Sequence, residues 1–213
     1  MKYTHLVWDW NGTLLDDVDL ALDVANGLFV ELGLAPVSRA RYLEIFDFPV
    51  QGYYERAGVD FTDLDFGTLS ARYGAAFETR LGEAQLFADA TRVLARLKTL
   101  GVAQYVLSST EHQALARMIA RFDLGAAFVD LQGLPDGLAR GKTEVGFDLL
   151  ANHQLHPNAT LLIGDTRHDW EVAQALGVDC VLVATGHQSR ERLAEFGVPV
   201  VGGLDDLLTW LQA

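Results

Sequence analysis

The sequence predicts an α/β fold in which a doubly wound parallel sheet carries an inserted helical cap domain. Short apolar runs end in polar turns that contain Gly, Ser or Asp, and amphipathic helical patterns lie between these runs. Apolar strands that alternate with helices indicate a parallel sheet covered on both faces, and such sheets bind ligands at the carboxyl ends of their strands. Residues 17–85 interrupt the alternation, which predicts the insertion.

Six segments of the chain have the pattern of a strand. They are residues 5–8, 102–107, 127–131, 160–163, 180–183 and 198–201, of which the third is weaker and the last is a short edge strand. The apolar residues between them recur at helical spacing. This spacing predicts helices at residues 91–100, 111–121, 143–152, 168–176, 189–196 and 204–211.

Residues 17–85 contain no convincing apolar strand and are expected to be helical. The stretch 19–32 is amphipathic and ends at Gly33, which is a usual place for a helix to stop. Shorter helices are expected at residues 39–46 and 51–57, and a longer one at 62–81. The sequence therefore predicts a core domain of residues 1–16 and 86–213, with a helical cap domain of residues 17–85.

The composition excludes several classes of protein. Half of the 213 residues are apolar, and the formal net charge of −13 repels nucleic acid and acidic membranes. No stretch approaches the ~20 apolar residues that a membrane helix needs, and the N-terminus lacks the pattern of a signal peptide. The one cysteine, Cys180, excludes an intramolecular disulfide. We expect a cytoplasmic protein with no nucleic-acid or membrane partner, whose oligomeric state the sequence leaves open.

Acidic residues at two predicted strand ends are candidates for chemistry. Asp9 follows the first strand, where a carboxylate can attack phosphorus, although an Asp before a Gly turn more often forms an Asx turn. Asp165 and Asp169 lie four residues apart, at a strand end and the start of a helix. They can converge on Mg²⁺, which binds carboxylate oxygens and keeps several waters, or they can cap that helix.

Hydroxyl and ammonium groups complete the pattern. Ser108 and Ser109 end the second strand, where they can hold a phosphoryl oxygen, and Lys142 is either a phosphate ligand or a solvated lysine. Along the chain the motifs are Asp-x-Asn-Gly-Thr, a strand-end Ser, Gly-Lys and Gly-Asp-x-x-x-Asp. Their order and spacing resemble the haloacid-dehalogenase-like superfamily, whose first motif is Asp-x-Asp-Gly-Thr. The layout looks like the phosphoglycolate-phosphatase branch of that superfamily.

The resemblance implies a Mg²⁺-dependent phosphatase that hydrolyses a small phosphorylated metabolite through an aspartyl phosphate. In this family pattern Asp9 would attack phosphorus, while Asp169 would support the metal site without holding the ion. Mg²⁺ would be held by Asp9, the backbone carbonyl of Asn11 and Asp165, and the phosphoryl oxygens by Ser108, Ser109 and Lys142.

One position departs from the family pattern. The second Asp of the family motif is the general acid/base, and Asn11 stands in its place. An amide cannot donate a proton to a leaving alkoxide, and general acid–base help is worth ~10²–10⁴ in rate. We therefore expect a slow or specialised phosphatase, unless His112, His168 or His187 supplies the proton. The alternative is a non-catalytic phosphate-binding or regulatory module.

The cap distinguishes among the other reactions of the superfamily. Residues 17–85 contain no lysine, which argues against the phosphonate-cleaving members, because these use a cap lysine. The acids Asp165 and Asp169 argue against the dehalogenating members, which need no Mg²⁺. Within the cap, the candidates for substrate specificity are Phe48, Gln51 and Arg56, of which Arg56 would meet a second anionic group.

Overall fold

The structure is a computed structural model that describes residues 2–135 and 141–213; residues 1 and 136–140 of the predicted core lie outside the described residues. Its strands are β1 (His5–Trp8), β2 (Leu15–Asp16), β3 (Gln85–Leu86), β4 (Ala103–Glu111), β5 (Asp130–Leu134), β6 (Thr160–Gly164), β7 (Asp179–Val183) and β8 (Val200–Val201). Its helices are α1 (Val18–Glu31), α2 (Arg39–Ile45), α3 (Val50–Arg56), α4 (Phe66–Arg80), α5 (Ala90–Thr99), α6 (His112–Arg121), α7 (Lys142–Asn152), α8 (Arg167–Leu176), α9 (Arg190–Ala194) and α10 (Leu204–Gln212).

Six parallel strands form the main sheet, in the order β5-β4-β1-β6-β7-β8. The chain passes from β1 to β4 and β5 on one side, and then returns to β6 on the other side of β1. This reversal creates a topological switch point beside β1, where open α/β sheets bind their ligands. The polar residues that follow β1, β4 and β6 therefore meet at one edge of the sheet.

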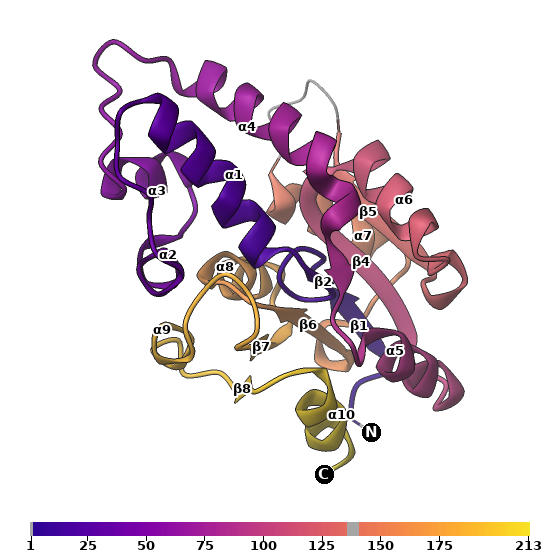
Figure 1. Cartoon of the computed structure of the whole chain (residues 1–213). Coiled ribbons are helices and arrows are strands. Elements are labelled where there is room, and N and C mark those ends of the chain that lie inside the picture. The colour runs from indigo at the N-terminus through magenta and orange to yellow at the C-terminus, as the bar shows by residue number, and fades with distance from the viewer. Residues whose placement is uncertain (1, 136–140) are drawn as a thin grey trace.

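Both faces of the sheet are covered, as the fully apolar strands predict. Along β1, Leu6 and Trp8 pack into one apolar layer and Val7 packs into the other. Residues of α5, α6 and α10 complete the first layer, and residues of α7, α8 and α9 complete the second. The predicted α/β fold with a doubly wound parallel sheet is confirmed (Figure 1).

Helices α1 to α4 lie together at one end of the molecule, away from both termini (Figure 1). They share an apolar cluster of their own, which includes Phe29, Tyr42 and Tyr53. Residues 17–84 contribute no strand to either sheet, and β2 and β3 pair antiparallel where the chain leaves and re-enters the core. The division into a core and a cap at residues 16/17 and 85/86 stays a prediction.

The observed elements differ from the predicted ones mainly at their ends. The strand expected at residues 127–131 lies at Asp130–Leu134, because Gly125–Ala127 forms a 3₁₀ turn before it. The strand expected at 198–201 is reduced to Val200–Val201, after Pro199, which has no N–H to donate to a ladder. The helix expected at 62–81 begins only at Phe66, where Asp65 accepts a capping bond from the Thr68 N–H.

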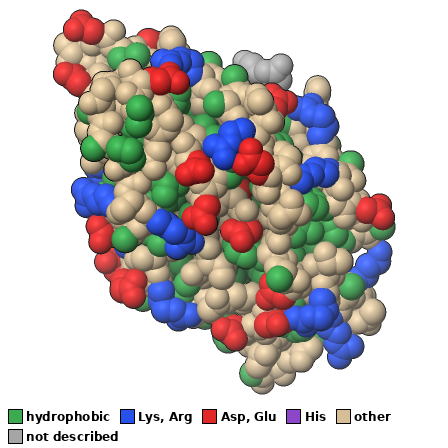
Figure 2. All heavy atoms as spheres, in the orientation of Figure 1, with side chains coloured by type: hydrophobic (Ala, Val, Ile, Leu, Met, Phe, Trp, Pro, Cys, Tyr) green, Lys and Arg blue, Asp and Glu red, His purple; other side chains and the backbone are tan. Residues whose placement is uncertain are grey.

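None of the described helices has the length and apolar character that a membrane crossing requires. The large hydrophobic side chains that are exposed come from separate segments: Val30, Leu100, Val129 and Phe147. On the face in Figure 2, hydrophobic side chains are interspersed with acidic and basic ones.

Candidate active site

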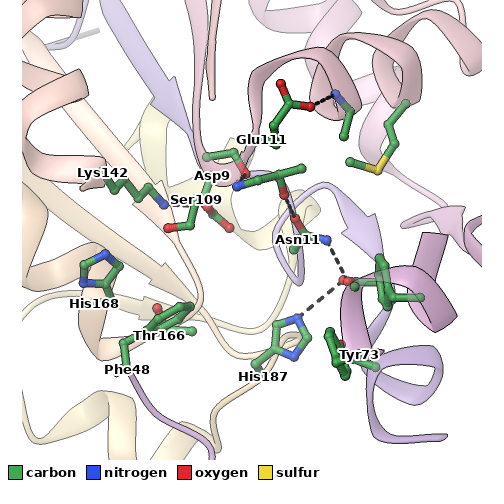
Figure 3. Close-up of a pocket in the computed structure, with 18 of the residues that line it drawn as sticks. Asp9, Asn11, Phe48, Tyr73, Ser109, Glu111, Lys142, Thr166, His168 and His187 are labelled. Carbon is green, nitrogen blue, oxygen red and sulfur yellow. Dashed lines mark hydrogen bonds and ion pairs between the residues drawn. The ribbon is translucent and has the colours of Figure 1, made fainter. Parts of the chain in front are cut away.

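Asp9 follows β1 at the carboxyl edge of the sheet, and its carboxylate lines a cavity of about 730 Å³ between the sheet and the cap helices. The strand continues into it, since the Asp9 N–H donates to the Ile163 carbonyl at 2.8 Å. Burial raises the pKa of Asp9 to about 6 against the opposing charge of Lys142. The backbone of Asp9, the candidate nucleophile, is thus hydrogen-bonded to the sheet, and its side chain lines the cavity (Figure 3).

Lys142 is the first residue of α7, and its ammonium is buried between two carboxylates. Its Nζ donates to Oδ1 of Asp9 and to Oδ1 of Asp169, each at 2.5 Å. Burial alone would lower the pKa of Lys142, but the charges of Asp169 and Asp9 raise it well above its usual range. The solvated-surface interpretation of Lys142 is therefore wrong, because only 3% of the residue is exposed.

Asp169 caps the helix that begins beside it and also contacts Lys142. Its Oδ2 accepts from the N–H and hydroxyl of Thr166, at 3.0 and 2.7 Å, and so caps the start of α8. Its Oδ1 faces Lys142. Burial opposes ionisation of Asp169, but the Lys142 ammonium and these donors hold its pKa below the usual range. Asp169 thus remains charged and orients Lys142.

Asp165 lies directly after β6 and is 1% exposed. Its carboxylate accepts from the Thr13 hydroxyl at 3.1 Å and from the His187 N–H at 2.6 Å. Burial, more than any other cause, raises the pKa of Asp165 to about 8. One oxygen from each of Asp9, Asp165 and Asp169 lies within 4.8 Å of the other two.

These residues fit a hard divalent cation. The three acids offer carboxylate oxygens, which are the ligands that Mg²⁺ prefers. Burial, the largest cause, raises the pKa of both Asp9 and Asp165, and a bound dication would favour their charged forms. The backbone is shaped around this point, because Gly12 has φ +72°, and a Cβ at Gly12 or Gly186 would overlap the Asp165 carboxylate.

Asn11 is fixed by two side chains far apart in sequence. Its Nδ2 donates to Oδ2 of Asp17 at 2.7 Å, and its Oδ1 accepts from the Thr110 hydroxyl at 2.8 Å (Figure 3). Because the Asp17 carboxylate can only accept a hydrogen bond, the amide nitrogen of Asn11 faces Asp17 and its oxygen faces Thr110. A carboxylate could accept from Thr110 but could not donate to Asp17. The structure thus matches the amide at position 11.

Asp17 connects Asn11 to a buried histidine. It is the residue before α1, yet its carboxylate makes no capping bond to that helix. Its Oδ1 accepts instead from the Gly12 N–H at 2.9 Å and lies 3.4 Å from Nε2 of His187. Burial opposes protonation of His187, but the Asp17 carboxylate raises its pKa to about 9. The other ring nitrogen lies 2.7 Å from the Tyr42 hydroxyl, which belongs to the cap.

The hydroxyl candidates lie at the end of β4. Ser108, Ser109 and Thr110 all line the cavity, and Ser108 is buried with its Oγ accepting from the Thr110 N–H at 3.1 Å. Of the three histidines, His168 and His187 line the cavity. His112 lies outside it and contacts the Gly133 N–H at 3.4 Å, so it does not face this site.

Of the cap candidates, only Phe48 lines the cavity. Gln51 donates to the Glu55 side chain on the same helix, at 3.0 Å. Arg56 donates through Nε to the Ile45 carbonyl at 2.9 Å and holds two cap helices together. The packing of α3 directs the Nε of Arg56 to this carbonyl and Arg56 does not line the cavity, so its contact with an anionic group of a ligand stays a prediction.

Sequence reasoning missed Asp17 and Thr110. Asp17 has the position of a helix cap, and Thr110 is one of several hydroxyls at the end of a strand. Their contacts to Asn11 span 6 and 99 residues of sequence. The one available signal was the Asn at position 11, because an amide in a carboxylate's place requires a partner that accepts a hydrogen bond.

Comparison with known proteins identifies the family of the chain. The haloacid dehalogenase-like hydrolase family matches residues 6–183. A phosphoglycolate phosphatase of Synechococcus elongatus is 25% identical, over 88% of this chain and 87% of its own. A 5'-nucleotidase of Pseudomonas aeruginosa is 29% identical, over 91% and 88%. In fold, a haloacid dehalogenase-like hydrolase of Streptococcus pneumoniae superposes with a TM-score of 0.81, at 21% identity and 99% coverage of both chains. The chain belongs to the haloacid dehalogenase-like hydrolase family, in its phosphatase branch.

Proposed function

We propose that the chain is a Mg²⁺-dependent phosphatase that hydrolyses a small phosphate monoester through a covalent phosphoaspartate at Asp9. The observation that carries the proposal is the buried cluster of Asp9, Asp165 and Asp169 with Lys142, which opens into a cavity large enough for a substrate. The relatives include a phosphoglycolate phosphatase and a 5'-nucleotidase, so they support the reaction class and not one substrate.

Each residue of the cluster has a separate task in this proposal. Asp9, Asp165 and the Asn11 carbonyl would hold Mg²⁺, which would supply positive charge against the phosphoryl oxygens. Lys142 would bind a second phosphoryl oxygen, and the buried Ser108 hydroxyl a third. Asp169 would keep the Lys142 ammonium charged and pointed at Asp9.

The reaction then proceeds in two displacements at phosphorus. A carboxylate oxygen of Asp9 attacks phosphorus, the bond from phosphorus to the ester oxygen breaks, and the alcohol leaves with a proton taken from water. A water molecule next attacks the phosphoaspartate, which releases inorganic phosphate and restores the Asp9 carboxylate. The sum is one ester and one water converted into one alcohol and one phosphate.

Asn11 sets which esters react quickly in this scheme. Its amide nitrogen already donates to Asp17, and it holds no proton that an alkoxide could remove. Esters with good leaving groups need little protonation, so they escape the ~10²–10⁴ loss in rate that alkyl esters suffer. The same substitution supports the second candidate, a phosphate-binding module without turnover.

One assay separates the two candidates. The purified chain would be tested on 4-nitrophenyl phosphate with Mg²⁺ and with excess chelator, beside its Asp9→Asn variant. We expect Mg²⁺-dependent turnover in the parent, none in the variant, and a hydroxylamine-sensitive phosphoenzyme only in the parent. A parent that binds phosphate and gives no turnover would favour the binding module. An Asp9→Asn variant as active as the parent would place the chemistry elsewhere.

A further inference from the structure

Apolar side chains from the cap and from α6 line the cavity together with the catalytic acids. We call this apolar part of the cavity the leaving-group chamber and define it by Ala21, Phe48, Tyr73, Gly74, Phe77 and Met118. A phosphoryl group held at Asp9 and Lys142 would point its ester oxygen into this space. The chemistry of these walls therefore describes the leaving group.

Aromatic rings form opposite sides of the chamber. On α4, Tyr73 and Phe77 stack with their ring centroids 5.7 Å apart and their planes at 21° to each other. Phe48 enters from the loop before α3 and lies against the His168 ring, with the two centroids 4.8 Å apart. Figure 3 shows Tyr73 and Phe48 on different sides of the cavity. Flat apolar walls of this kind accept a flat ring, because aromatic pairs gain from stacked and edge contacts.

Charge in the cap argues against an anionic leaving group. The structure describes all of residues 17–85, and no arginine of this segment lines the cavity. Each is engaged elsewhere: Arg39 with Asp19, Arg41 with Glu44, Arg56 with the Ile45 carbonyl, Arg72 with Glu31, and Arg80 with Glu83. A carboxylate on the leaving group would find no cap cation to pair with it.

The charged groups near the chamber are mostly acids. Glu111 lines the cavity, and its carboxylate accepts from the N–H groups of Gln113 and Ala114, each at 2.8 Å. Arg117 also lines the cavity, but its guanidinium donates to the Glu78 carboxylate at 3.2 Å. The cation at the rim therefore already has a carboxylate partner, in an exposed ion pair.

We infer that the substrates of this site are phosphate monoesters whose leaving group is a flat, uncharged aromatic ring system. The inference rests on the proposed phosphatase function and names its substrate class. This substrate class is also compatible with Asn11 in place of the general acid, because an aryl oxide can leave without receiving a proton. A small ester that carries a carboxylate would fill little of the chamber and would meet the acids Glu78 and Glu111.

Gly74 is the glycine of α4 that lines the cavity. A Cβ built on it would meet no atom within 4 Å. A larger side chain can therefore extend from this helix without a clash and narrow the cavity. Gly27, in α1, offers a matched control, because a Cβ there also meets nothing within 4 Å and Gly27 does not line the cavity.

The test compares four substrates at saturating Mg²⁺: acetyl phosphate, phenyl phosphate, 2-naphthyl phosphate and 4-carboxyphenyl phosphate. We expect kcat/KM to rise on the order of tenfold from phenyl to naphthyl, since the added ring buries more apolar surface. The para-carboxylate should lower kcat/KM on the order of tenfold, although it makes the phenolate a better leaving group. Gly74→Leu should remove the preference for naphthyl over phenyl, and Gly27→Leu should retain it.

The outcomes distinguish this inference from the function on which it rests. If acetyl phosphate and all three aryl esters are inert, the proposed phosphatase function fails. If they are hydrolysed but 4-carboxyphenyl phosphate equals or exceeds phenyl phosphate, the uncharged aromatic class is wrong and the function survives. A Gly74→Leu variant with the parent's preference for naphthyl would show that the leaving group does not pass Gly74 and would overturn the chamber as its site.

Discussion

The pair of Asn11 and Asp17 gives the sharpest prediction, because their roles can be exchanged. In the parent, the Asn11 amide donates to Asp17 across 2.7 Å. Asn11→Asp alone would replace this donor with a second carboxylate. At 2.7 Å and an effective dielectric of ~20, two unit charges repel by about 6 kcal/mol, which is enough to keep one shared proton on the pair near neutral pH.

The single variant should therefore lose stability and gain little rate. The folded pair must either take up a proton or bear the repulsion between two carboxylates, and we expect this to lower the free energy of unfolding in urea by about 1.5–3 kcal/mol. The double variant Asn11→Asp, Asp17→Asn exchanges the donor and the acceptor. The amide introduced at position 17 can donate to the carboxylate introduced at position 11, while its oxygen still accepts from the Gly12 N–H. The exchange restores this hydrogen bond but not the charge contact between Asp17 and His187, so stability should return only part of the way to that of the parent.

The double variant should also hydrolyse alkyl phosphates faster by about 10²–10⁴, with a much smaller gain on aryl phosphates. The assay measures kcat for one alkyl and one aryl ester at saturating Mg²⁺, with Asp17→Asn as the control that lacks the acid. Less phosphoenzyme should accumulate, since the returned Asp assists the attack of water. A folded double variant that is no faster on the alkyl ester would refute the reasoning, and Asn11 would not limit turnover.

Three further predictions test other parts of the site. Asp165→Ala should weaken Mg²⁺ binding, measured by calorimetry without substrate, by more than the roughly 10–100-fold that loss of a supporting residue costs; unchanged affinity would rule out the metal site. Glu78→Gln should free Arg117 and raise kcat/KM a few-fold for carboxylated aryl phosphates alone, as expected when an exposed ion pair is broken; equal gains on uncharged esters would contradict this. The Arg192 guanidinium donates to the carbonyls of residues 43 and 46, so Arg192→Ala should speed amide hydrogen exchange in residues 43–47. Exchange as slow as in the parent would show that other contacts hold this segment.

The sheet could be predicted from sequence because its strands are buried on both faces. Residues of β1, β6 and β7 form continuous apolar runs, and the polar residue that ends each run marks the carboxyl edge. The pair β2 and β3 could not be predicted, since each has only two residues and no apolar run. Asp9 and Asp165 were found because they follow the apolar runs of β1 and β6, whereas Lys142 was identified by its place in the family pattern of motifs.

The cap side of the site could not be predicted because helix orientation decides it. Arg56 and Phe48 are eight residues apart, yet the packing of α3 directs one to a backbone carbonyl and leaves the other at the cavity. Helical periodicity identifies the buried face of a helix but does not say which neighbour covers it. Tyr73 and Phe77 look like ordinary core residues in sequence, and only the tertiary fold places them on the cavity wall.

Charge balance explains why an amide at position 11 suits this cavity. Among the described residues, the buried ionisable side chains that line it are four carboxylates and two cations: Asp9, Asp17, Asp165, Asp169, Lys142 and His187. With His187 protonated, since Asp17 raises its pKa to about 9, full ionisation leaves two negative charges, which one Mg²⁺ would neutralise. An Asp at position 11 would add a fifth carboxylate next to Asp17 and break this balance. Asn11 is thus compatible with Mg²⁺ binding, and what it lowers is the rate of proton transfer to the leaving group.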